Sequence, residues 1–527
     1  MGIDYQKSTV YAMLERSAQR WPKATAYRFM GKKTSYLQLL ERIGHIASAL
    51  HALGIGPGDR VSVCMPNMPQ AVDCFYALNR LGAVANMVHP LCAAQELRFY
   101  LELTKSKAVL TLDSFYEKVA SVASDAVILT ARVKPELPLH KRLFYKEKPL
   151  PGGVDFQQLY RTPVGLPPAP ADSSACACIL YSGGTTGKPK GVCLSSDNLN
   201  AAALQTLRAS GYEDFAGLKM LSAMPLFHGF GLGVGIHTPL IAGASCLLVP
   251  RFERKSFFQL LKRQRPHFLP GVPSLFEAMV QAPEMKGVSL DFLKGVFCGG
   301  DILPPTLKER IDAFLQEHGC HVQLREGYGM TECVSVAALT PDHAGKAGTV
   351  GLPLAHMRFQ VVTPGTVDPV ATGQVGEICI SGPTVMLGYL DDPSETAMAL
   401  QTHADGALWL HTGDLGSLDD QGYLCFHGRL KRMIVTNGYN VYPAQLEKVL
   451  LQHPGVKECC VLGVADGQRG QRVRAFAVAE DSVTQQQLLS HCSCYIARYA
   501  MPREIVFCKE LPKTPLGKVD YQKLEAL

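Results

Sequence analysis

Segments with the composition of strands alternate with segments of helical apolar spacing over residues 58–113. Residues 58–67 predict a strand that ends in a turn, 68–82 a helix, 83–90 a strand, 93–106 a helix and 107–113 a strand. This alternation is typical of a doubly wound α/β fold, in which helices cover both faces of a mostly parallel sheet. We therefore expect an α/β protein built on such sheets.

The pattern of predicted strands and helices changes further along the chain. With 527 residues the chain is too long for a single hydrophobic core, so we expect two or more domains. Residues 347–428 contain short apolar segments separated by glycine turns, which predicts a β-rich subdomain. From Arg429 onwards, strand and helix patterns alternate again in a small α/β unit. The sequence thus predicts a large domain over 1–428 and a small α+β domain over 432–527.

A glycine-rich segment at 181–192 reads YSGGTTGKPKGV and directly follows an apolar segment, 174–181, that predicts a buried strand. It supplies glycines, hydroxyl groups and lysines: Gly183, Gly184, Gly187, Ser182, Thr185, Thr186, Lys188 and Lys190. Glycines let the backbone approach an anion closely, and the other residues add donors and positive charge. This predicts a polyphosphate cradle between two sheet elements. It is not a Walker A loop, because Pro189 follows Lys188. A plain surface loop is the alternative.

The composition excludes several other classes of protein. The net charge is +6, and from Arg429 to the end there are 14 Lys and Arg against 9 Asp and Glu. This weakly basic unit suits a polyanionic ligand, but it is too poor in charge and clustered aromatic residues to indicate nucleic-acid binding. The 17 cysteines have neither disulfide nor zinc spacing, so we expect reduced thiols in a cytoplasmic protein. A metal site at His491, Cys492 and Cys494 is an alternative that the spacing does not favour.

Neither a secretion signal nor a membrane span is expected. The first twenty residues are polar and helical in pattern, without a basic and apolar leader. Residues 220–250 contain no Asp, Glu, Lys or Arg, and their length alone would allow a membrane span. Because this stretch contains Pro225, Pro239 and several glycines, we interpret it as a strand, a loop, a buried helix and a second strand.

Further clusters follow the glycine-rich segment in a fixed order. They read MPLFHGFG (224–231), CGGD (298–301), REGYGMTE (325–332), GEICISGPTVMLGYL (376–390), HTGDLG (411–416), GRLKRMIVTNGYNVYPAQLE (428–447) and PKTPLGKVD (512–520). With the glycine-rich segment, this series resembles the adenylate-forming superfamily, which comprises acyl- and aryl-CoA synthetases, firefly luciferase and carrier-loading adenylation domains. The resemblance covers nearly the whole chain. It implies activation of a carboxylate by ATP and a small C-terminal domain that moves about a hinge at 429–431.

The clusters after residue 298 contain the candidate nucleotide-binding residues. Tyr328 offers a flat face for adenine, Thr331 can reach a phosphate oxygen, and Glu332 is an acid beside a triphosphate site, where it would bind Mg²⁺. Asp414 can accept hydrogen bonds from both ribose hydroxyls, and the resemblance assigns Arg429 to the ribose as well. The remaining candidates are Gly299, Gly300, Asp301, Gly327, Gly329 and Met330.

The resemblance also implies catalytic and transfer residues. Lys518 matches the lysine that bridges the carboxylate and the α-phosphate, where a fixed cation offsets the negative charge of the transition state. His228 matches a gate between the acyl pocket and the pantetheine tunnel. Thr185 of the glycine-rich segment is a further catalytic candidate beside Lys518 and His228. Gly438 and Tyr439 match the loop that lines the thiol tunnel. Lys431 falls at the hinge position. A core histidine is the alternative for His228.

The candidate acyl pocket contains no acid. Amino-acid-activating members need an acid to hold the ammonium group, yet residues 228–242 have none, and an unpaired buried ammonium is costly. We therefore expect an apolar substrate, either fatty or aromatic. Residues that could line its pocket are Phe230, Leu232, Val234, Ile236, Thr238, Cys298, Gly299 and Gly300.

Three functions remain open at this point. The first is an acyl-CoA synthetase that uses ATP, Mg²⁺ and coenzyme A. The second is an adenylating enzyme that passes the acyl group to a separate acyl carrier protein or to an amine. Asn440 and Val435 stand where aryl-CoA ligases often carry Gln and Lys, which keeps this alternative open. The third is a non-catalytic nucleotide-binding regulatory protein, which the intact Lys518, Glu332, Asp414 and Arg429 disfavour.

Overall fold

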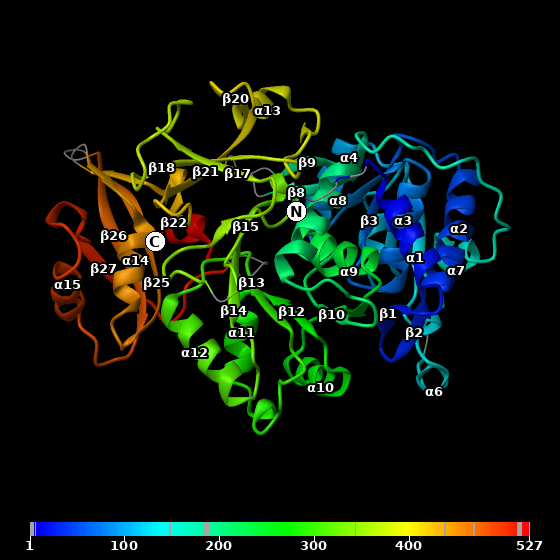
Figure 1. The fold of residues 1–527 in the computed structure, drawn as a ribbon, viewed down its shortest axis with the longest axis horizontal. Coiled ribbons are helices and arrows are strands. Elements are labelled where there is room, and N and C mark those ends of the chain that lie inside the picture. Colours follow the sequence, from blue (N-terminus) through cyan, green and yellow to red (C-terminus); the bar gives the residue numbers. More distant parts are fainter. Residues whose placement is uncertain are drawn as a thin grey trace.

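Two large sheets, a smaller antiparallel sheet and a separate C-terminal unit make up the structure, a computed structural model (Figure 1). It describes residues 5, 7–146, 149–182, 189–342, 344–436, 439–466, 470–513, 519–525 and 527. The C-terminal unit, coloured orange to red, lies beside the larger N-terminal part (Figure 1). This arrangement confirms the expected mixed α/β fold with a small α+β domain at its end.

The first sheet has the strand order β19-β9-β8-β4-β3-β5-β6-β7. Its bounds are Arg60–Cys64 (β3), Val84–Met87 (β4), Ala108–Leu112 (β5), Val127–Ala131 (β6), Val154–Asp155 (β7), Cys176–Ser182 (β8), Lys190–Ser195 (β9) and Gly388–Tyr389 (β19). Strands β3 to β8 pair in parallel, whereas β9 returns antiparallel to β8. The strands predicted within 58–113 are confirmed, as is the strand that leads into the glycine-rich segment.

The second sheet has the order β16-β15-β14-β13-β12-β10-β11-β1-β2. Its bounds are Thr25–Phe29 (β1), Lys32–Ser35 (β2), Lys219–Ser222 (β10), Ser245–Leu248 (β11), Phe268–Gly271 (β12), Gly295–Cys298 (β13), Leu324–Tyr328 (β14), Ala338–Leu339 (β15) and Leu352–Pro353 (β16). Between β10 and β11 the chain forms a π-helix, Phe230–His237 (η3), followed by α9, Thr238–Ile241. The interpretation of 220–250 is therefore confirmed. Among the described residues, no helix combines the length and apolar character that crossing a membrane requires.

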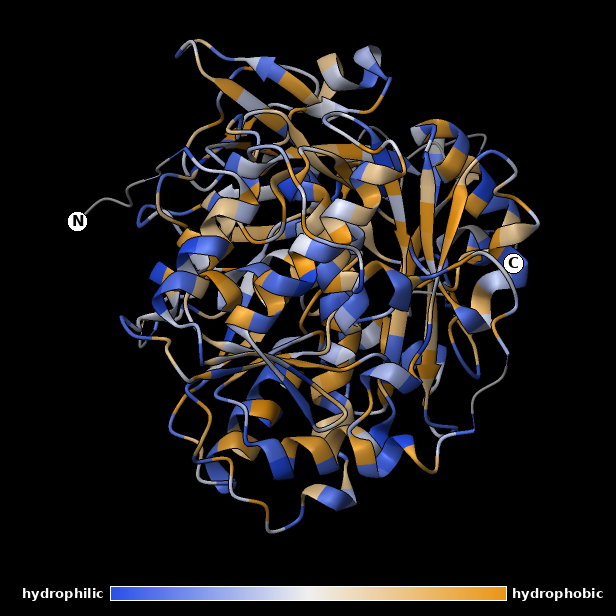
Figure 2. Cartoon of the chain, turned by 90° about the vertical axis from the view of Figure 1, so that its right-hand side faces the viewer, coloured by the Kyte–Doolittle hydropathy of each residue, from blue (hydrophilic) through white to orange (hydrophobic). Residues whose placement is uncertain are grey.

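Helices and both large sheets share one hydrophobic core. The remaining helices of this part are Val10–Arg20 (α1), Tyr36–Ala52 (α2), Pro69–Arg80 (α3), Ala94–Thr104 (α4), Tyr116–Ala120 (α5), Leu139–Arg142 (α6), Phe156–Leu159 (α7), Ser196–Ser210 (α8), Arg254–Gln264 (α10), Pro273–Val280 (α11), Pro305–Glu317 (α12) and Pro393–Ala399 (α13). Orange, hydrophobic strands contrast with helices that carry both colours (Figure 2). Ser195 caps the start of α8, because its Oγ accepts a hydrogen bond of 3.1 Å from the Asn198 amide.

The third sheet is antiparallel, with β17, β18, β21 and β20 in that order and β22 paired with β21. Its bounds are Arg358–Val362 (β17), Gly376–Ser381 (β18), Leu400–Thr402 (β20), Leu408–Leu418 (β21) and Leu424–Arg429 (β22). It is the β-rich subdomain that the short strands and glycine turns predict.

The C-terminal unit has its own sheet and its own core. The strands are Ile434–Thr436 (β23), Tyr439–Val441 (β24), Val456–Asp466 (β25), Gly470–Ala479 (β26) and Glu504–Phe507 (β27), and the helices are Pro443–Leu451 (α14), Gln485–Ser493 (α15) and Tyr521–Glu525 (α16). Ile434, Leu446, Val461 and Leu488 are buried together in this unit. A core of this kind lets the small unit keep its shape as a separate body.

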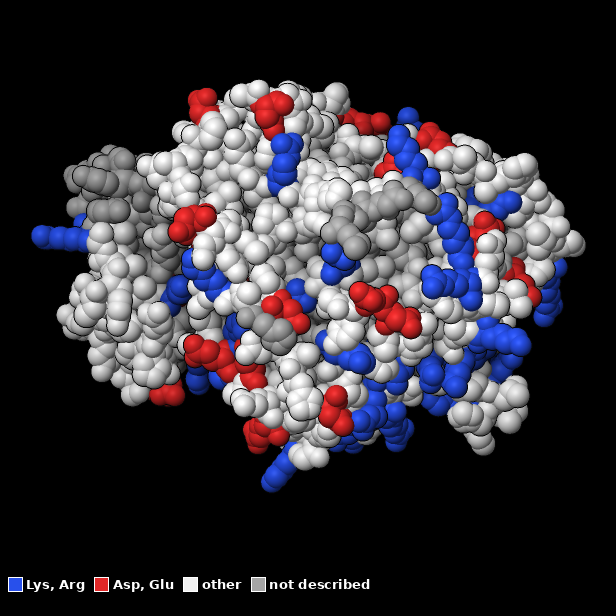
Figure 3. Space-filling view, viewed as in Figure 1, with Lys and Arg blue, Asp and Glu red and all other residues white. Residues whose placement is uncertain are grey.

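Basic side chains are also numerous outside the C-terminal unit. They crowd the lower right of the face seen in Figure 3, the region where Figure 1 places α10, a helix that carries Arg254, Lys255, Lys262 and Arg263. Within the C-terminal unit, Arg432 pairs with Glu447 and Arg474 with Glu504. These pairs leave the predicted basic excess unchanged, because the count of 14 Lys and Arg against 9 Asp and Glu already includes both acids.

Candidate active site

Several of the sequence clusters follow the carboxyl ends of neighbouring parallel strands. Strands β10, β12, β13 and β14 pair in parallel, so their carboxyl ends lie along one edge of the second sheet. From this edge the chain continues into the segment of His228 after β10, Gly299–Asp301 after β13 and Gly329–Glu332 after β14. Ligands of open α/β sheets bind outside the carboxyl ends of the strands. The fold therefore gathers these predicted residues where a ligand can reach them.

The backbones of these segments approach each other closely. A Cβ atom on Gly229 would lie 1.5 Å from the carbonyl oxygen of Val334, and one on Gly329 would lie 1.7 Å from that of Ser335. Val334 itself has a φ of +66°, which is an outlier for a β-branched residue. Strain of this kind persists where packing over-determines the backbone, and it is common at functional sites. The loop after Glu332 is thus held against the loop that carries His228.

Asp414 joins the second and third sheets. It is buried in β21, and its Oδ2 accepts a hydrogen bond of 2.7 Å from the hydroxyl of Tyr328 at the end of β14. Its Oδ1 lies 2.7 Å from a guanidinium nitrogen of Arg429, its register partner in β22. Burial raises the pKa of Asp414 to about 6, although the charge of Arg429 and the Tyr328 hydrogen bond act in the opposite direction. Burial also holds the pKa of the Tyr328 hydroxyl well above its usual value, so this group stays a donor.

Glu332 lies in a short 3₁₀ turn, Thr331–Cys333 (η5), and its side chain is buried. Its Oε1 accepts a hydrogen bond of 3.0 Å from the hydroxyl of Tyr389 in β19, and its carbonyl oxygen accepts one of 2.9 Å from the Met386 amide. Lys190 lies over the ring of Tyr389, with Nζ 4.8 Å from the ring centroid, and forms an ion pair with Glu395. Tyr389 therefore connects Glu332 to the strand that follows the glycine-rich segment.

The two strands that flank the glycine-rich segment pair with each other. Ser182 at the end of β8 is the register partner of Lys190 at the start of the antiparallel strand β9. Several predicted residues lie outside the described part of the chain: Gly183, Gly184, Thr185, Thr186, Gly187, Lys188, Gly438 and Lys518. For Tyr439 the structure describes only the backbone, in β24, where Thr436 is its partner.

The remaining predicted residues lie around the same edge. Gly299 and Gly327 are close, because a Cβ atom on Gly299 would be 3.3 Å from the Gly327 carbonyl oxygen. Met330 and Thr331 are half-buried, whereas Gly300 and Asp301 are exposed. Lys431 is exposed in a second 3₁₀ turn, Leu430–Arg432 (η6).

His228 precedes the π-helix, at the turn that the sequence predicts. Its ring is half-buried and lies 4.9 Å from the ring of Phe227, which in turn lies 4.4 Å from the ring of His89. Short π-helical segments are frequent at functional sites. Phe230, the first residue of this helix, is also half-buried.

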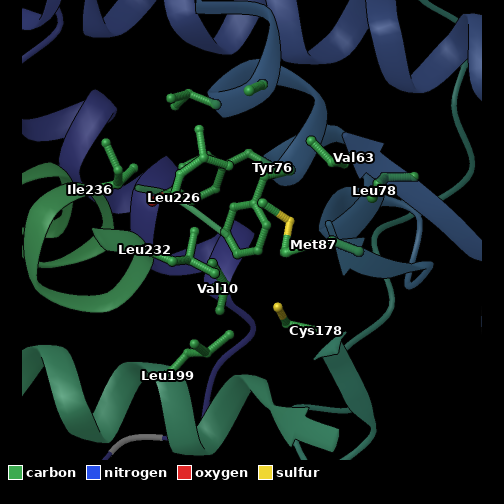
Figure 4. Packing of buried hydrophobic residues seen from close by; sticks show 14 of the residues in the cluster. Val10, Val63, Tyr76, Leu78, Met87, Cys178, Leu199, Leu226, Leu232 and Ile236 are labelled. Carbon is green, nitrogen blue, oxygen red and sulfur yellow. The ribbon is translucent and has the colours of Figure 1, made fainter. Parts of the chain in front are cut away.

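Three of the predicted pocket residues are buried in the structure. Leu232 and Ile236 are buried in the main core, where they lie beside Tyr76 (Figure 4). Thr238 is buried as well, and its hydroxyl donates to the Gly233 carbonyl oxygen at 2.8 Å. These three positions therefore stabilise the π-helix and its packing. The expectation that they line the acyl pocket stays a prediction.

Sequence reasoning missed Tyr389 and Glu395. Tyr389 belongs to a cluster that the sequence analysis quotes, and the only available signal was its place in that cluster. Glu395 lies in α13, and nothing in its local sequence separates it from an ordinary surface acid. Both are brought to Glu332 and Lys190 by the pairing of β19 with β9.

Comparisons with known proteins define the class. A family model described as AMP-binding enzyme matches residues 14–390, and one described as AMP-binding enzyme C-terminal domain matches residues 445–518. The chain therefore belongs to the AMP-binding enzyme family. Among curated proteins it is 30% identical to a long-chain-fatty-acid–CoA ligase of Bacillus subtilis (strain 168), covering 98% of this chain and 94% of that protein. It is 31% identical to a feruloyl-CoA synthase of an Amycolatopsis species, covering 96% of each chain.

Solved structures agree with this assignment. The fold matches the crystal structure of ATP-bound MatB from Rhodopseudomonas palustris with a TM-score of 0.86, at 27% identity over 99% of both chains. It matches a benzoate CoA ligase from Burkholderia xenovorans LB400 with a TM-score of 0.82, at 26% identity over 98% of this chain and 99% of that one. The expected large N-terminal part and small C-terminal domain are thereby confirmed.

Proposed function

We propose that this protein is an AMP-forming acid–CoA ligase that activates an apolar carboxylic acid. The carboxylate and ATP would give an acyl-adenylate and pyrophosphate, and CoA would then displace AMP to give an acyl-CoA thioester. The ligase class is supported by the relatives, which are named CoA ligases or synthetases. The observation that carries the proposal is the buried Asp414, held by Tyr328 and Arg429 at the edge where the strands of the second sheet end.

We assign the ATP site to residues of the N-terminal part. A carboxylate can accept two hydrogen bonds, so Asp414 would take both ribose hydroxyls, with Arg429 beside it. Tyr328, Gly327, Gly329, Met330, Thr331, Gly299, Gly300 and Asp301 would surround the nucleoside, and residues 182–190 would hold the phosphates. Each of these roles is a proposal.

Glu332 fits the metal that this reaction needs. Mg²⁺ prefers hard oxygen ligands, and Glu332 offers a buried carboxylate with lone pairs beyond the one that accepts from Tyr389. Mg²⁺ held there would neutralise phosphate charge. Tyr389 would orient the carboxylate, and Lys190, held over the Tyr389 ring and paired with Glu395, would offer an ammonium group to the phosphates.

The chemical step we propose is attack of the substrate carboxylate on the α-phosphorus. An oxygen–phosphorus bond forms, and the bond to the pyrophosphate leaving group breaks. Because two anions approach each other, the step needs a fixed cation near the equatorial oxygens, and Lys518 would supply it. Domain boundaries at 428 and 432, with a hinge at 429–431, would then let the C-terminal domain present a different face, including Gly438 and Tyr439, for transfer to CoA.

The substrate class rests on the segment from His228 to Ala242, which contains no acid. A free amino acid would leave its ammonium group unpaired in this region. His228 and Phe230, both half-buried at the start of the π-helix, are the side chains we propose for the acyl entrance. The named relatives include both a fatty and an aryl ligase, so chain length and ring preference are the next question.

The deciding experiment is pyrophosphate release across a panel of fatty, aryl and amino acids, with and without CoA. We expect turnover with fatty or aryl acids and thioester formation that depends on CoA. Thioester formation only on a purified acyl carrier protein, or acyl transfer only to amines, would overturn the CoA assignment. Nucleotide binding without pyrophosphate release for any acid would identify a non-catalytic regulator.

A further inference from the structure

Three metal-ligating side chains come together in the third sheet. Cys379 lies in β18, His411 lies opposite it in β21 as its register partner, and His403 follows the end of β20. Cys379 Sγ and one ring nitrogen of each histidine all lie within 4.8 Å of one another. Cys379 and His403 are buried, and the His411 side chain is only 6% exposed. This cluster lies outside the residues proposed for the reaction.

The two imidazole rings are oriented by separate partners. His411 Nδ1 lies 3.1 Å from a carboxylate oxygen of Glu377, and His403 Nδ1 lies 2.6 Å from Oε1 of Gln360. The ring of His403 also stacks on Trp409, with centroids 5.3 Å apart. A carboxylate oxygen only accepts, so His411 Nδ1 carries a proton. The amide oxygen of Gln360 is also an acceptor, so His403 Nδ1 carries a proton as well. Histidine ligands of metals characteristically donate their second ring nitrogen to such groups.

This leaves the two Nε2 atoms facing each other at 3.0 Å. With both Nδ1 atoms protonated, two neutral rings would direct their lone pairs at each other, which is repulsive. A cation between them removes the repulsion. That cation is either a proton shared by the rings or a metal ion, and the thiol of Cys379 beside them favours a metal with affinity for both nitrogen and sulfur.

We propose that Cys379, His403 and His411 form a binding site for Zn²⁺. Tetrahedral zinc has bonds of about 2.0–2.1 Å to imidazole nitrogen and about 2.3 Å to thiolate sulfur, which separates two nitrogen ligands by roughly 3.3 Å. The rings need to open only slightly from their 3.0 Å separation to reach this nitrogen–nitrogen distance. The same bond lengths place sulfur about 3.6 Å from each nitrogen, so Cys379 Sγ, which lies within 4.8 Å of them, closes in by a rotation of its side chain. The charges also balance, because one thiolate and the Glu377 carboxylate offset the two charges of zinc. Water would take the fourth position.

The zinc site would be linked to the proposed nucleotide site through Glu377. One oxygen of its carboxylate contacts His411, and the other accepts a hydrogen bond of 3.0 Å from the amide of Gly413. Gly413 directly precedes Asp414 in β21. A metal that fixes His411 therefore also fixes Glu377 and the backbone that presents Asp414. We assign the ion a positioning role in the third sheet.

Sequence spacing could not reveal this site. The three ligands belong to separate strand segments and follow no short motif. The alternative metal site considered in the sequence analysis, His491 with Cys492 and Cys494, does not form a comparable cluster among the described residues. His491 Nε2 instead lies 2.9 Å from the Val449 carbonyl oxygen. Cys492→Ser is therefore a matched control for Cys379→Ser, since both cysteines are fully buried.

The test uses the full-length protein, treated with a chelator and then titrated with Zn²⁺ or Co²⁺ alone, without nucleotide. We expect one Zn²⁺ per chain, an increase in Tm that Mg²⁺ does not reproduce, and a cobalt spectrum with the thiolate charge-transfer band. Cys379→Ser should lose the band and His403→Gln should lose stoichiometric zinc, whereas Cys492→Ser should retain both. Gln360→Leu should weaken zinc affinity by about 10–100-fold, the usual cost of losing a group that orients a ligand.

Equal zinc retention by wild type, Cys379→Ser and His403→Gln would overturn the proposal and leave adventitious binding. No change in the wild-type Tm and no thiolate–cobalt band would also overturn it, and the two rings would then share a proton. If Cys379→Ser fails to fold, the wild-type cobalt spectrum and the affinity of Gln360→Leu still decide the question.

Discussion

Arg429 and Arg432 are close neighbours in the chain, yet their guanidinium groups pair with acids of different parts of the molecule. Arg429 lies 2.7 Å from Asp414 in β21 of the third sheet, and Arg432 lies 2.5 Å from Glu447 in α14 of the C-terminal unit. Arg432 also lies over the ring of Tyr521, 4.2 Å from its centroid. Each arginine is therefore anchored to its own side, and only Leu430 and Lys431 lie between the two anchors. This is where a rotation of the C-terminal domain would have to be absorbed.

The hinge proposal predicts a selective effect of Lys431→Pro. Proline fixes φ near −65° and removes an amide donor, so it should restrict the rotation that follows adenylation. We expect adenylate formation to remain within a few-fold of wild type and thioester formation to slow strongly. Single-turnover assays would measure the pyrophosphate burst and then thioester formation from purified adenylate and CoA. Lys431→Ala serves as the control and should support both steps. Normal transfer in the proline variant would place the pivot elsewhere.

Lys518→Ala should reduce carboxylate activation by roughly 10²–10³-fold, the loss typical of one fixed donor to a transition state. Thioester formation from supplied acyl-adenylate should be spared, because that half-reaction no longer involves the pyrophosphate leaving group. The measurement is pyrophosphate release beside the transfer assay described above. Equal losses in both half-reactions would make Lys518 a structural residue.

Glu332→Gln should raise the Mg²⁺ concentration needed for adenylation and slow the reaction by roughly 10²-fold at limiting Mg²⁺. The amide keeps the size of the side chain but removes the charge that stabilises a bound metal. Tyr389→Phe removes only the hydroxyl that orients Glu332 and keeps the carboxylate, so it should change the Mg²⁺ dependence less than Glu332→Gln does. A wild-type Mg²⁺ dependence in Glu332→Gln would refute the metal role.

The environment of Asp414 predicts that ATP binding weakens at low pH. Its pKa is raised to about 6, mainly by burial, so the carboxylate becomes protonated as the pH falls through about 6 and can then accept fewer hydrogen bonds from a ribose. The KM for ATP should therefore increase below pH 6. Tyr328→Phe removes a hydrogen bond that favours the ionised form, which should move this limit to higher pH and weaken ATP binding by about 10–100-fold. If wild type and Tyr328→Phe had the same pH profile of the KM for ATP, the proposed effect of Tyr328 on the pKa of Asp414 would be wrong.

Free α-amino acids should be poor substrates beside their deaminated analogues. The reason is the absence of any acid from residues 228–242, which would leave the ammonium group without a partner. Matched pairs such as phenylalanine and 3-phenylpropanoate should differ by at least tenfold in kcat/KM for pyrophosphate release. A preference for the amino acid in any pair would exclude the proposed pocket.

The order of the main elements could be predicted from sequence because their signals are local. The alternation over 58–113 gave β3, α3, β4, α4 and β5, and the uncharged stretch 220–250 gave β10, a buried helix and β11. Apolar periodicity and turn residues act over a few positions, so they can be recognised without knowing the tertiary structure. The clusters carry the family resemblance in the same local way.

The contacts that define the site depend on residues far apart in the chain. Tyr328 and Asp414 are separated by 86 positions, and they meet because the end of β14 packs beside β21. Leu232 and Ile236 have the same local character as pocket residues, but the π-helix turns them into the core. Which face of an apolar helix is buried depends on what packs against it, and sequence alone does not contain that partner.

By itself the sequence determined the class of this protein, since local patterning specifies the strands and helices and the ordered clusters specify the family. Only the tertiary structure decided which side chains share an environment. It paired Glu332 with Tyr389, anchored Arg429 and Arg432 to acids in different parts of the molecule, and brought Cys379, His403 and His411 together. The physical reason is that strand pairing and sheet packing fix these distances through long-range contacts, whose register no single segment encodes.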